Sequence, residues 1–308
     1  MQTEHPHRPG GTQNATTAHA ASIHDIGYRN YEGARLGRAY ARRSLFAQSL
    51  RGAYGLGRSA KSKITPMILF GIMCAPALIV VAVAITTDLN DLPVDYREYA
   101  GYLAPVLGLY LAAMAPQSVS RDLRFHTVPL YFSRPIERVD YVLAKYAAMA
   151  SALLVFTTAP LLILYVGALL GELDFGEQTA DLALGFVSVA VLSVLYAGIG
   201  LVIAALTPRR GFGVAAIIGV LTVPYFAVST LQFIADNGNN ADAVGWLGLA
   251  SPGTLVSGFQ AKFLGAPSDF PGAVVPSHAA GACYLLLVLA LVAGSYAVLM
   301  ARYRKAGL

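Results

Sequence analysis

The sequence predicts an all-α polytopic membrane protein with six transmembrane helices. Two independent observations lead to this fold class: the length of the uncharged stretches and the distribution of the charges between them. Six stretches of at least 22 residues contain no charged side chain, whereas a hydrocarbon core of about 30 Å requires about 20 helical residues. The six predicted spans are 64–87, 99–120, 146–171, 182–208, 211–235 and 279–301.

Basic residues lie almost entirely on one side of the predicted membrane. All but two of the 22 Lys and Arg residues fall before the first span, in the connections after the second and fourth spans, or after the sixth span. The other three connections hold 11 of the 17 acidic residues. Because short basic loops stay in the cytoplasm, both termini are predicted to be cytoplasmic, as an even number of spans requires.

The residues before the first span divide into two parts. Residues 1–30 are polar and have no cleavable signal, so we expect a disordered cytoplasmic tail. Residues 31–63 are basic and are predicted to form an amphipathic helix in the cytoplasmic interface, with a solvated basic linker as the alternative. Four of their apolar residues share one helical face: Phe46, Leu50, Ala53 and Tyr54.

The last outer connection, 236–277, is the longest and is too apolar for a solvated loop. It contains Trp246 and, further on, Phe259 and Phe263. We expect this segment to be partly re-entrant, dipping into the membrane or capping the spans between the fifth and sixth crossings. A short helix is predicted to begin at Ser251 or Pro252.

The inner connection after the second span, 121–146, carries apolar and charged residues together. It is predicted to form two short amphipathic helices, broken at 133–135, where Pro135 suits a first helical turn. Such a surface on the cytoplasmic side fits a docking site for another protein. A helix resting on lipid is the alternative, and composition does not decide between them.

Several kinds of chemistry are excluded by what the sequence lacks. The predicted spans contain no Asp, Glu, Lys, Arg or His, which argues against a proton-driven pump and against an intramembrane protease or metal enzyme. No Gly-x-x-x-x-Gly-Lys-Ser/Thr motif is present, so any ATP would be used by another polypeptide. We therefore expect no catalytic residue, no cofactor site and no metal site. The basic residues flank spans, and no nucleic-acid-binding motif appears.

The inner connection resembles the signature of ABC-2-type ABC transporter permeases, the transmembrane subunits of these transporters. The signature lies between the second and third spans, as in that family, and the resemblance covers roughly residues 40–308. Many members have Glu in place of Asp122 and Gly in place of Ala144, so details of the docking interface are expected to differ. The matching residues are Arg121, Asp122, Leu123, Thr127, Val128, Pro129, Leu130, Ser133, Arg134, Pro135 and 140–145.

The resemblance implies an assembly of four subunits. In this family two permeases, identical or different, assemble with two cytoplasmic ABC ATPase subunits, and a coupling helix after the second span contacts the ATPase. Segment 31–63 would then be the family's elbow helix before the first span. The residues that would contact or support the ATPase are Arg121, Asp122, Thr127, Leu130, Ser133, Arg134, Pro135 and Arg138.

A translocation path is sought among polar and aromatic residues of the spans. The candidates are Tyr110, Gln117, Tyr165, Tyr196, Tyr225 and Ser229. Helix–helix packing is the alternative role for each of them.

The resulting expectation is a permease domain, 64–301, followed by a short cytoplasmic tail, 302–308, in a bacterial cytoplasmic membrane. We expect it to export a hydrophobic or amphipathic small molecule, because the spans are uncharged and rich in small residues and tyrosines. Sodium extrusion, lipid handling and protein assembly are alternatives within the same architecture. A six-span scaffold without transport is the alternative from another class.

Overall fold

The computed structural model describes residue 33 and residues 36–57, 59–87, 91–125, 131, 136–207 and 209–306, with the side chains of Arg121 and Arg210 left out. The chain divides into two units, Met1–Arg35 and Leu36–Leu308, and the described helices all belong to the second. The predicted disordered tail, 1–30, lies outside the described residues and stays a prediction.

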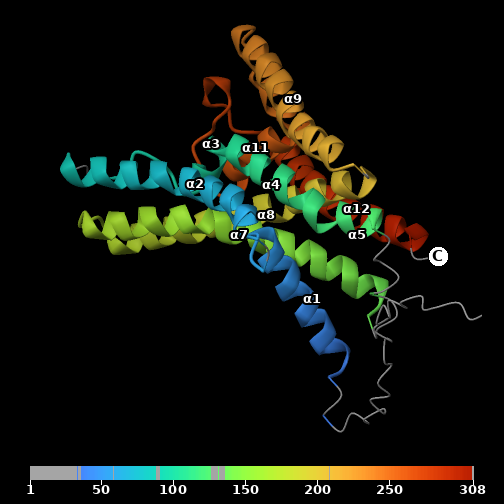
Figure 1. The fold of residues 1–308 in the computed structure, drawn as a ribbon. Coiled ribbons are helices and arrows are strands. Elements are labelled where there is room, and N and C mark those ends of the chain that lie inside the picture. Colours follow the sequence, from blue (N-terminus) through green and yellow to red (C-terminus); the bar gives the residue numbers. More distant parts are fainter. Residues whose placement is uncertain are drawn as a thin grey trace, which may run out of the picture. The chain divides into compact units, whose positions relative to one another are not determined.

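Every regular element in the described part of the chain is a helix, as predicted (Figure 1). Five helices are long and apolar enough to cross a membrane, which makes this a multi-pass membrane protein. They correspond to the first, third, fourth, fifth and sixth predicted spans. These helices are α2 (Ala60–Thr86), α7 (Arg138–Leu170), α8 (Phe175–Leu206), α9 (Arg210–Asn237) and α12 (His278–Ala306).

The predicted second span, 99–120, is not one continuous helix, so the count of six uninterrupted spans is not obtained. It is divided into α3 (Tyr99–Tyr102), α4 (Ala104–Ser118) and the start of α5 (Ser120–Arg124). Pro105 has no backbone N–H to donate to the preceding turn and stands in the first turn of α4, just after the break at Leu103. The 15 residues of α4 are fewer than the about 20 that cross a hydrocarbon core.

Helix α1 (Arg38–Ala53) lies within the predicted basic segment 31–63 and packs against α7 and α4. Of the four residues predicted to share a face, Ala53 is buried and the other three are half-buried. The Tyr54 hydroxyl, just after the helix, donates a hydrogen bond to the Ala152 carbonyl of α7 at 2.7 Å. The apolar side of this segment therefore covers other helices of the same chain.

The long connection between α9 and α12 is mostly helical. Its third element begins at Pro252, as predicted, and packs against α8, α9 and α12. Leu255 and Val256 are almost completely buried there. The connection consists of α10 (Ala241–Leu247), η1 (Gly248–Ala250), α11 (Pro252–Phe263) and η2 (Pro271–Ala273).

Glycines let the long helices approach one another closely. A Cβ atom placed on Gly167 of α7 would lie 2.2 Å from a methyl group of Val81 on α2, and one on Gly200 of α8 would lie 2.6 Å from Leu111 on α4. Figure 1 shows α2 and α7 side by side, while α9 diverges from them. Close backbone contact at small residues is how helices in membranes commonly associate.

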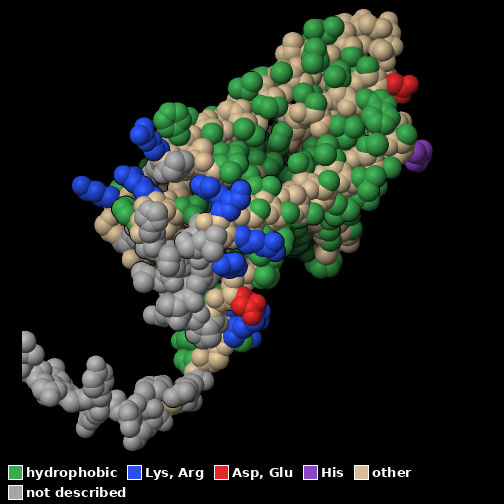
Figure 2. Space-filling model, turned by 90° about the vertical axis from the view of Figure 1, so that its right-hand side faces the viewer, with side chains coloured by type: hydrophobic (Ala, Val, Ile, Leu, Met, Phe, Trp, Pro, Cys, Tyr) green, Lys and Arg blue, Asp and Glu red, His purple; other side chains and the backbone are tan. Residues whose placement is uncertain are grey.

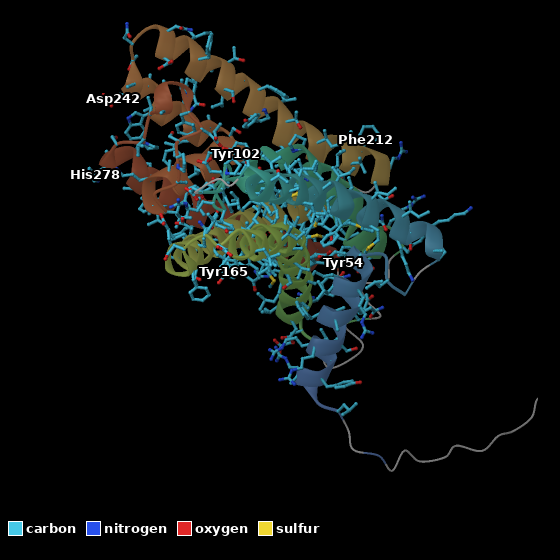
Figure 3. The ribbon with its side chains drawn as sticks, turned by 90° about the vertical axis from the view of Figure 1, so that its left-hand side faces the viewer. Tyr54, Tyr102, Tyr165, Phe212, Asp242 and His278 are labelled. Atoms are coloured by element: carbon cyan, nitrogen blue, oxygen red, sulfur yellow. The ribbon has the colours of Figure 1, made fainter. Side chains whose placement is uncertain are left out.

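Charged residues mark two ends of the unit. Lys and Arg side chains gather toward one end of the face in Figure 2, and hydrophobic side chains cover most of the rest. At this basic end lie α1, α5, the first turns of α7 and the last turns of α8 and α12, where Arg302 donates to the Ala205 carbonyl at 3.2 Å. Figure 3 shows Asp242 and His278 at the other end, away from Phe212 and Tyr54.

Candidate functional site

An ion pair joins the two ends of the signature segment, 121–145. The Lys145 ammonium group of α7 lies 2.9 Å from a carboxylate oxygen of Asp122 on α5, and it also donates to the Ser118 carbonyl at 3.0 Å. The Tyr141 hydroxyl donates to the same Asp122 oxygen at 2.6 Å. We call Asp122, Tyr141 and Lys145 the base cluster.

The base cluster is shielded from solvent within the described structure. Lys145 is only 8% exposed, and the Tyr141 ring is fully buried between the rings of Tyr131 and Tyr303. A charge in such a place is tolerated only when it is paired and hydrogen-bonded, and each partner here is. The cluster therefore fixes where α5 stops and α7 starts.

A second set of ion pairs holds α1 against the first turn of α7. The Arg38 guanidinium group donates to Asp140 at 2.6 Å and also pairs with Glu137, and Arg42 lies 3.7 Å from Asp140. The Asp140 side chain is 3% exposed, so it depends on these partners and on the Glu137 backbone N–H. Arg38 and Asp140 thus connect α1 to the segment that precedes α7.

The structure describes few of the predicted ATPase-coupling residues. Asp122 belongs to the base cluster, and Arg138 is exposed as the first residue of α7. Arg121 lies in α5, but its side chain is not described. The others lie outside the described residues: Thr127, Leu130, Ser133, Arg134 and Pro135. Their predicted contacts with an ATPase stay predictions.

Four of the six candidate path residues lie apart from one another. Tyr110 is buried against the Phe156 ring, with centroids 4.4 Å apart, and Gln117 lines a cavity of about 300 Å³ beside the base cluster. Tyr165 shares a 2.9 Å hydrogen bond with Thr179 between α7 and α8. Ser229 is half-buried on α9. No single space joins these four.

The other two candidates, Tyr196 of α8 and Tyr225 of α9, line one cavity of about 520 Å³. Its walls come from α3, α4, α8, α9 and α11, and most of its lining is apolar. We call it the apolar cavity. Residues on both sides of the interruption at Leu103 form part of its wall. Representative lining residues are Leu109, Leu192, Ile218, Leu221, Phe226 and Val256.

A polar network connects the elements at the end of the apolar cavity where Asp95, Glu98 and Asp269 lie. Gln260 of α11 donates to the Ser188 hydroxyl at 2.7 Å, and Ser188 donates to the Arg97 carbonyl at 2.6 Å. The Arg97 guanidinium group pairs with Asp95 and donates to the Leu264 carbonyl at 2.9 Å. The hydrogen bonds and the nearby carboxylates raise the pKa of Arg97, which stays charged. The connection before α3, helix α8 and the end of α11 are thereby fixed to one another.

Two carboxyl groups lie near the same end of the apolar cavity. Asp269 lines it, and Glu98 accepts a 2.6 Å hydrogen bond from the hydroxyl of Tyr102, another lining residue. Burial raises the pKa of Glu98 to about 7, with the negative charges of Asp269 and Asp95 adding to the shift. Burial also raises the pKa of Asp269. Figure 3 labels Tyr102, which lines the cavity and is 56% exposed.

The fold and its charge distribution define a multi-pass membrane protein. The family model of ABC-2 family transporter proteins matches residues 10–308, nearly the whole chain. The chain belongs to this family and is a membrane permease component of an ABC transporter, as the signature segment predicted. No curated protein matches the chain.

Sequence reasoning missed several residues that the structure brings together. Lys145 and Tyr141 stood inside the signature, but nothing in the spacing showed that they contact Asp122. Glu98 and Asp269 were counted only as acidic loop residues. Glu98 and Asp269 are far apart in the chain, so the sequence did not show that they lie close together. The apolar character of the last connection did predict that it dips into the membrane or caps the spans.

Proposed function

We propose that this permease exports a hydrophobic or amphipathic small molecule through the apolar cavity, using ATP hydrolysed by a separate subunit. The family membership supports the transporter role. The observation that carries the substrate class is the cavity itself: a space of about 520 Å³ with mostly apolar walls and three tyrosines, a composition typical of small-molecule sites.

In the proposed assembly the chain supplies no nucleotide site of its own. Two cytoplasmic ABC ATPase subunits bind ATP, and a second permease, identical or different, completes the complex in a bacterial cytoplasmic membrane. The basic end faces the cytoplasm, in keeping with the distribution of Lys and Arg. Helices α3 and α4 together complete a sixth crossing, and residues on both sides of the interruption at Leu103 line the apolar cavity.

The base cluster supports a role for the signature segment as the coupling element. Because Asp122 and Lys145 bind each other, a force on the residues between them reaches the helices on either side together. The α1 ion pairs extend that connection to the elbow position. A movement imposed by the ATPase would then shift α4, α7 and α1 as one body, which is how packed elements transmit a conformational change.

An export assay with a matched pair of tryptophan variants tests this proposal. Leu221 lines the cavity and is 8% exposed. Leu231 lies more than two helical turns further along α9, outside the cavity, and is 49% exposed. Leu221→Trp fills the cavity and is expected to raise accumulation of a substrate panel in cells to the level of cells lacking the chain. Leu231→Trp is expected to export normally. Equal export by both variants would rule out this cavity as the path.

A further inference from the structure

The wall of the apolar cavity carries one carboxylate. Three tyrosines, Tyr102, Tyr196 and Tyr225, present aromatic rings to the space, and Asp269 lies on its wall beside Tyr102. No Lys, Arg or His side chain is among the described lining residues. A cation held against tyrosine rings gains from the negative faces of those rings, and a partly desolvated site strengthens that gain.

The charges next to this wall are not balanced. Arg97 is the nearby base, but it is engaged by Asp95, by Asp181 at 3.7 Å and by the Leu264 carbonyl. In the part of the chain that the structure describes, neither Glu98 nor Asp269 has an ion-pair partner. The acidic end of the cavity therefore has an excess of negative charge that no neighbouring side chain neutralises.

Glu98 adds a second, independent observation. Its residue is 3% exposed, and while one carboxylate oxygen accepts the Tyr102 hydrogen bond, the other oxygen, Oε1, is buried without a hydrogen-bond partner. An acceptor left in this way costs about 1–3 kcal/mol, so native structures rarely keep one without a use. Glu98 is thus hydrogen-bonded to Tyr102, which itself lines the cavity.

We infer that the apolar cavity selects amphipathic organic cations, with Asp269 as the counter-ion on its wall and Glu98 as a second carboxylate behind Tyr102. This inference rests on the proposed function, since it names the substrate class of the same cavity. Apolar walls hold the hydrophobic body of the substrate, while the tyrosine rings and carboxylates hold its charge. A neutral compound of the same shape gains only the apolar contacts.

The protonation of Glu98 makes the binding of a permanent cation depend on pH. The groups that face Glu98 are Tyr102, Asp269, Asp95 and Arg97; the two aspartates raise its pKa, and Arg97 and the Tyr102 hydrogen bond lower it. With a pKa of about 7, Glu98 loses most of its charge as the pH falls from about 8 to about 6. Cation binding is therefore expected to weaken over that range.

Equilibrium binding to the purified full chain in lipid nanodiscs tests the inference. The two compounds are tetraphenylphosphonium, a permanent cation, and triphenylphosphine oxide, a neutral compound with similar rings. Asp269→Asn is expected to raise the Kd for tetraphenylphosphonium about tenfold and to change the Kd for triphenylphosphine oxide less than twofold. Asp269→Glu keeps the carboxylate and is expected to retain cation binding. This variant distinguishes the loss of the charge from a structural effect of substituting Asp269.

Matched variants make every outcome decisive. Asp242→Asn removes an exposed carboxylate on α10 outside the cavity and should leave both compounds unaffected. Glu98→Gln should remove the pH dependence between about pH 6 and 8. If Asp269→Asn weakens both compounds equally, or neither, the cation inference is wrong while the cavity still stands as a path. If wild type binds neither compound, or if Leu221→Trp leaves the binding of both intact, the proposed function fails together with the inference.

Discussion

Burial of the Glu98 carboxyl group ties the stability of the fold to pH. Its pKa rises from an ordinary value of 4.5 to about 7, so the folded chain binds more protons than the unfolded chain between these values. The free energy of unfolding therefore falls as the pH rises through this window, and the stabilisation by the protonated form is lost above about pH 7.

Glu98→Gln should consequently stabilise the protein in alkaline solution. We expect a gain on the order of 2 kcal/mol at about pH 8, shrinking markedly at about pH 5, where the native carboxyl group is already protonated. Thermal unfolding of the purified chain at the two pH values measures this. Glu177→Gln, at an exposed position on α8, is the control and should change little at either pH. A gain that does not depend on pH would contradict the assigned burial.

The base cluster predicts strong coupling between two substitutions. Asp122→Asn removes the carboxylate that pairs with Lys145 and leaves its buried ammonium group without an ion-pair partner among the described residues, so we expect a loss of about 3 kcal/mol or more. Lys145→Met alone should also destabilise. The double variant should lose less than the sum of the two single losses, because it leaves no unpaired charge. Additive losses in thermal unfolding would show that the ion pair is not formed.

Only part of the site could be predicted at the residue scale. Tyr196 and Tyr225 were chosen as polar or aromatic residues of uncharged spans, and they do line one cavity. Tyr110 and Gln117 were chosen by the same rule, yet Tyr110 packs against Phe156 and Gln117 lines a different cavity. Which side of a buried helix meets a cavity depends on its neighbours, and a helix that is apolar all round gives no such signal.

Among the elements, the close contact of α8 with the connection before α3 yields a prediction. A Cβ atom on Gly185 of α8 would lie 2.8 Å from the Tyr96 Cβ and 3.3 Å from the Tyr96 backbone carbon, which cannot easily move. Gly185→Ala should therefore destabilise the protein by about 1–3 kcal/mol in thermal unfolding. Gly219→Ala on α9, where nothing lies within 4 Å, is the matched control and should be neutral or slightly stabilising. Equal effects of the two variants would argue against close packing at α8.

Length and charge explain why most elements could be predicted. An uncharged stretch of more than 20 residues has few alternatives to a spanning helix, and five such helices formed. Their ends were less predictable: α7 begins at Arg138, before the uncharged stretch, because its charged first turns are paired with α1 and α5. The break at Leu103 was also missed, since an isolated proline in an apolar run is compatible with a kink as well as with an interruption.

At the scale of the whole molecule, the described unit has a basic end and an acidic end. The basic end carries the signature segment and the ion pairs that tie α1, α5 and α7 together. The acidic end carries the apolar cavity, with Asp269 on its wall and Glu98 hydrogen-bonded to the lining residue Tyr102. Helices α4 and α8 run between them, so a movement at the basic end would alter the cavity walls directly. Transport driven from the cytoplasmic side requires such a connection.

The central claim is that a separate ABC ATPase binds the signature segment on the basic end, and co-purification tests it most directly. The tagged chain is co-expressed with an ABC ATPase and isolated as wild type, as Arg134→Glu in the signature segment, and as Arg304→Glu in the last turns of α12. We predict that the ATPase elutes with wild type and with Arg304→Glu, and that Arg134→Glu lowers its yield about tenfold or more. Full retention of the ATPase by Arg134→Glu would contradict the account.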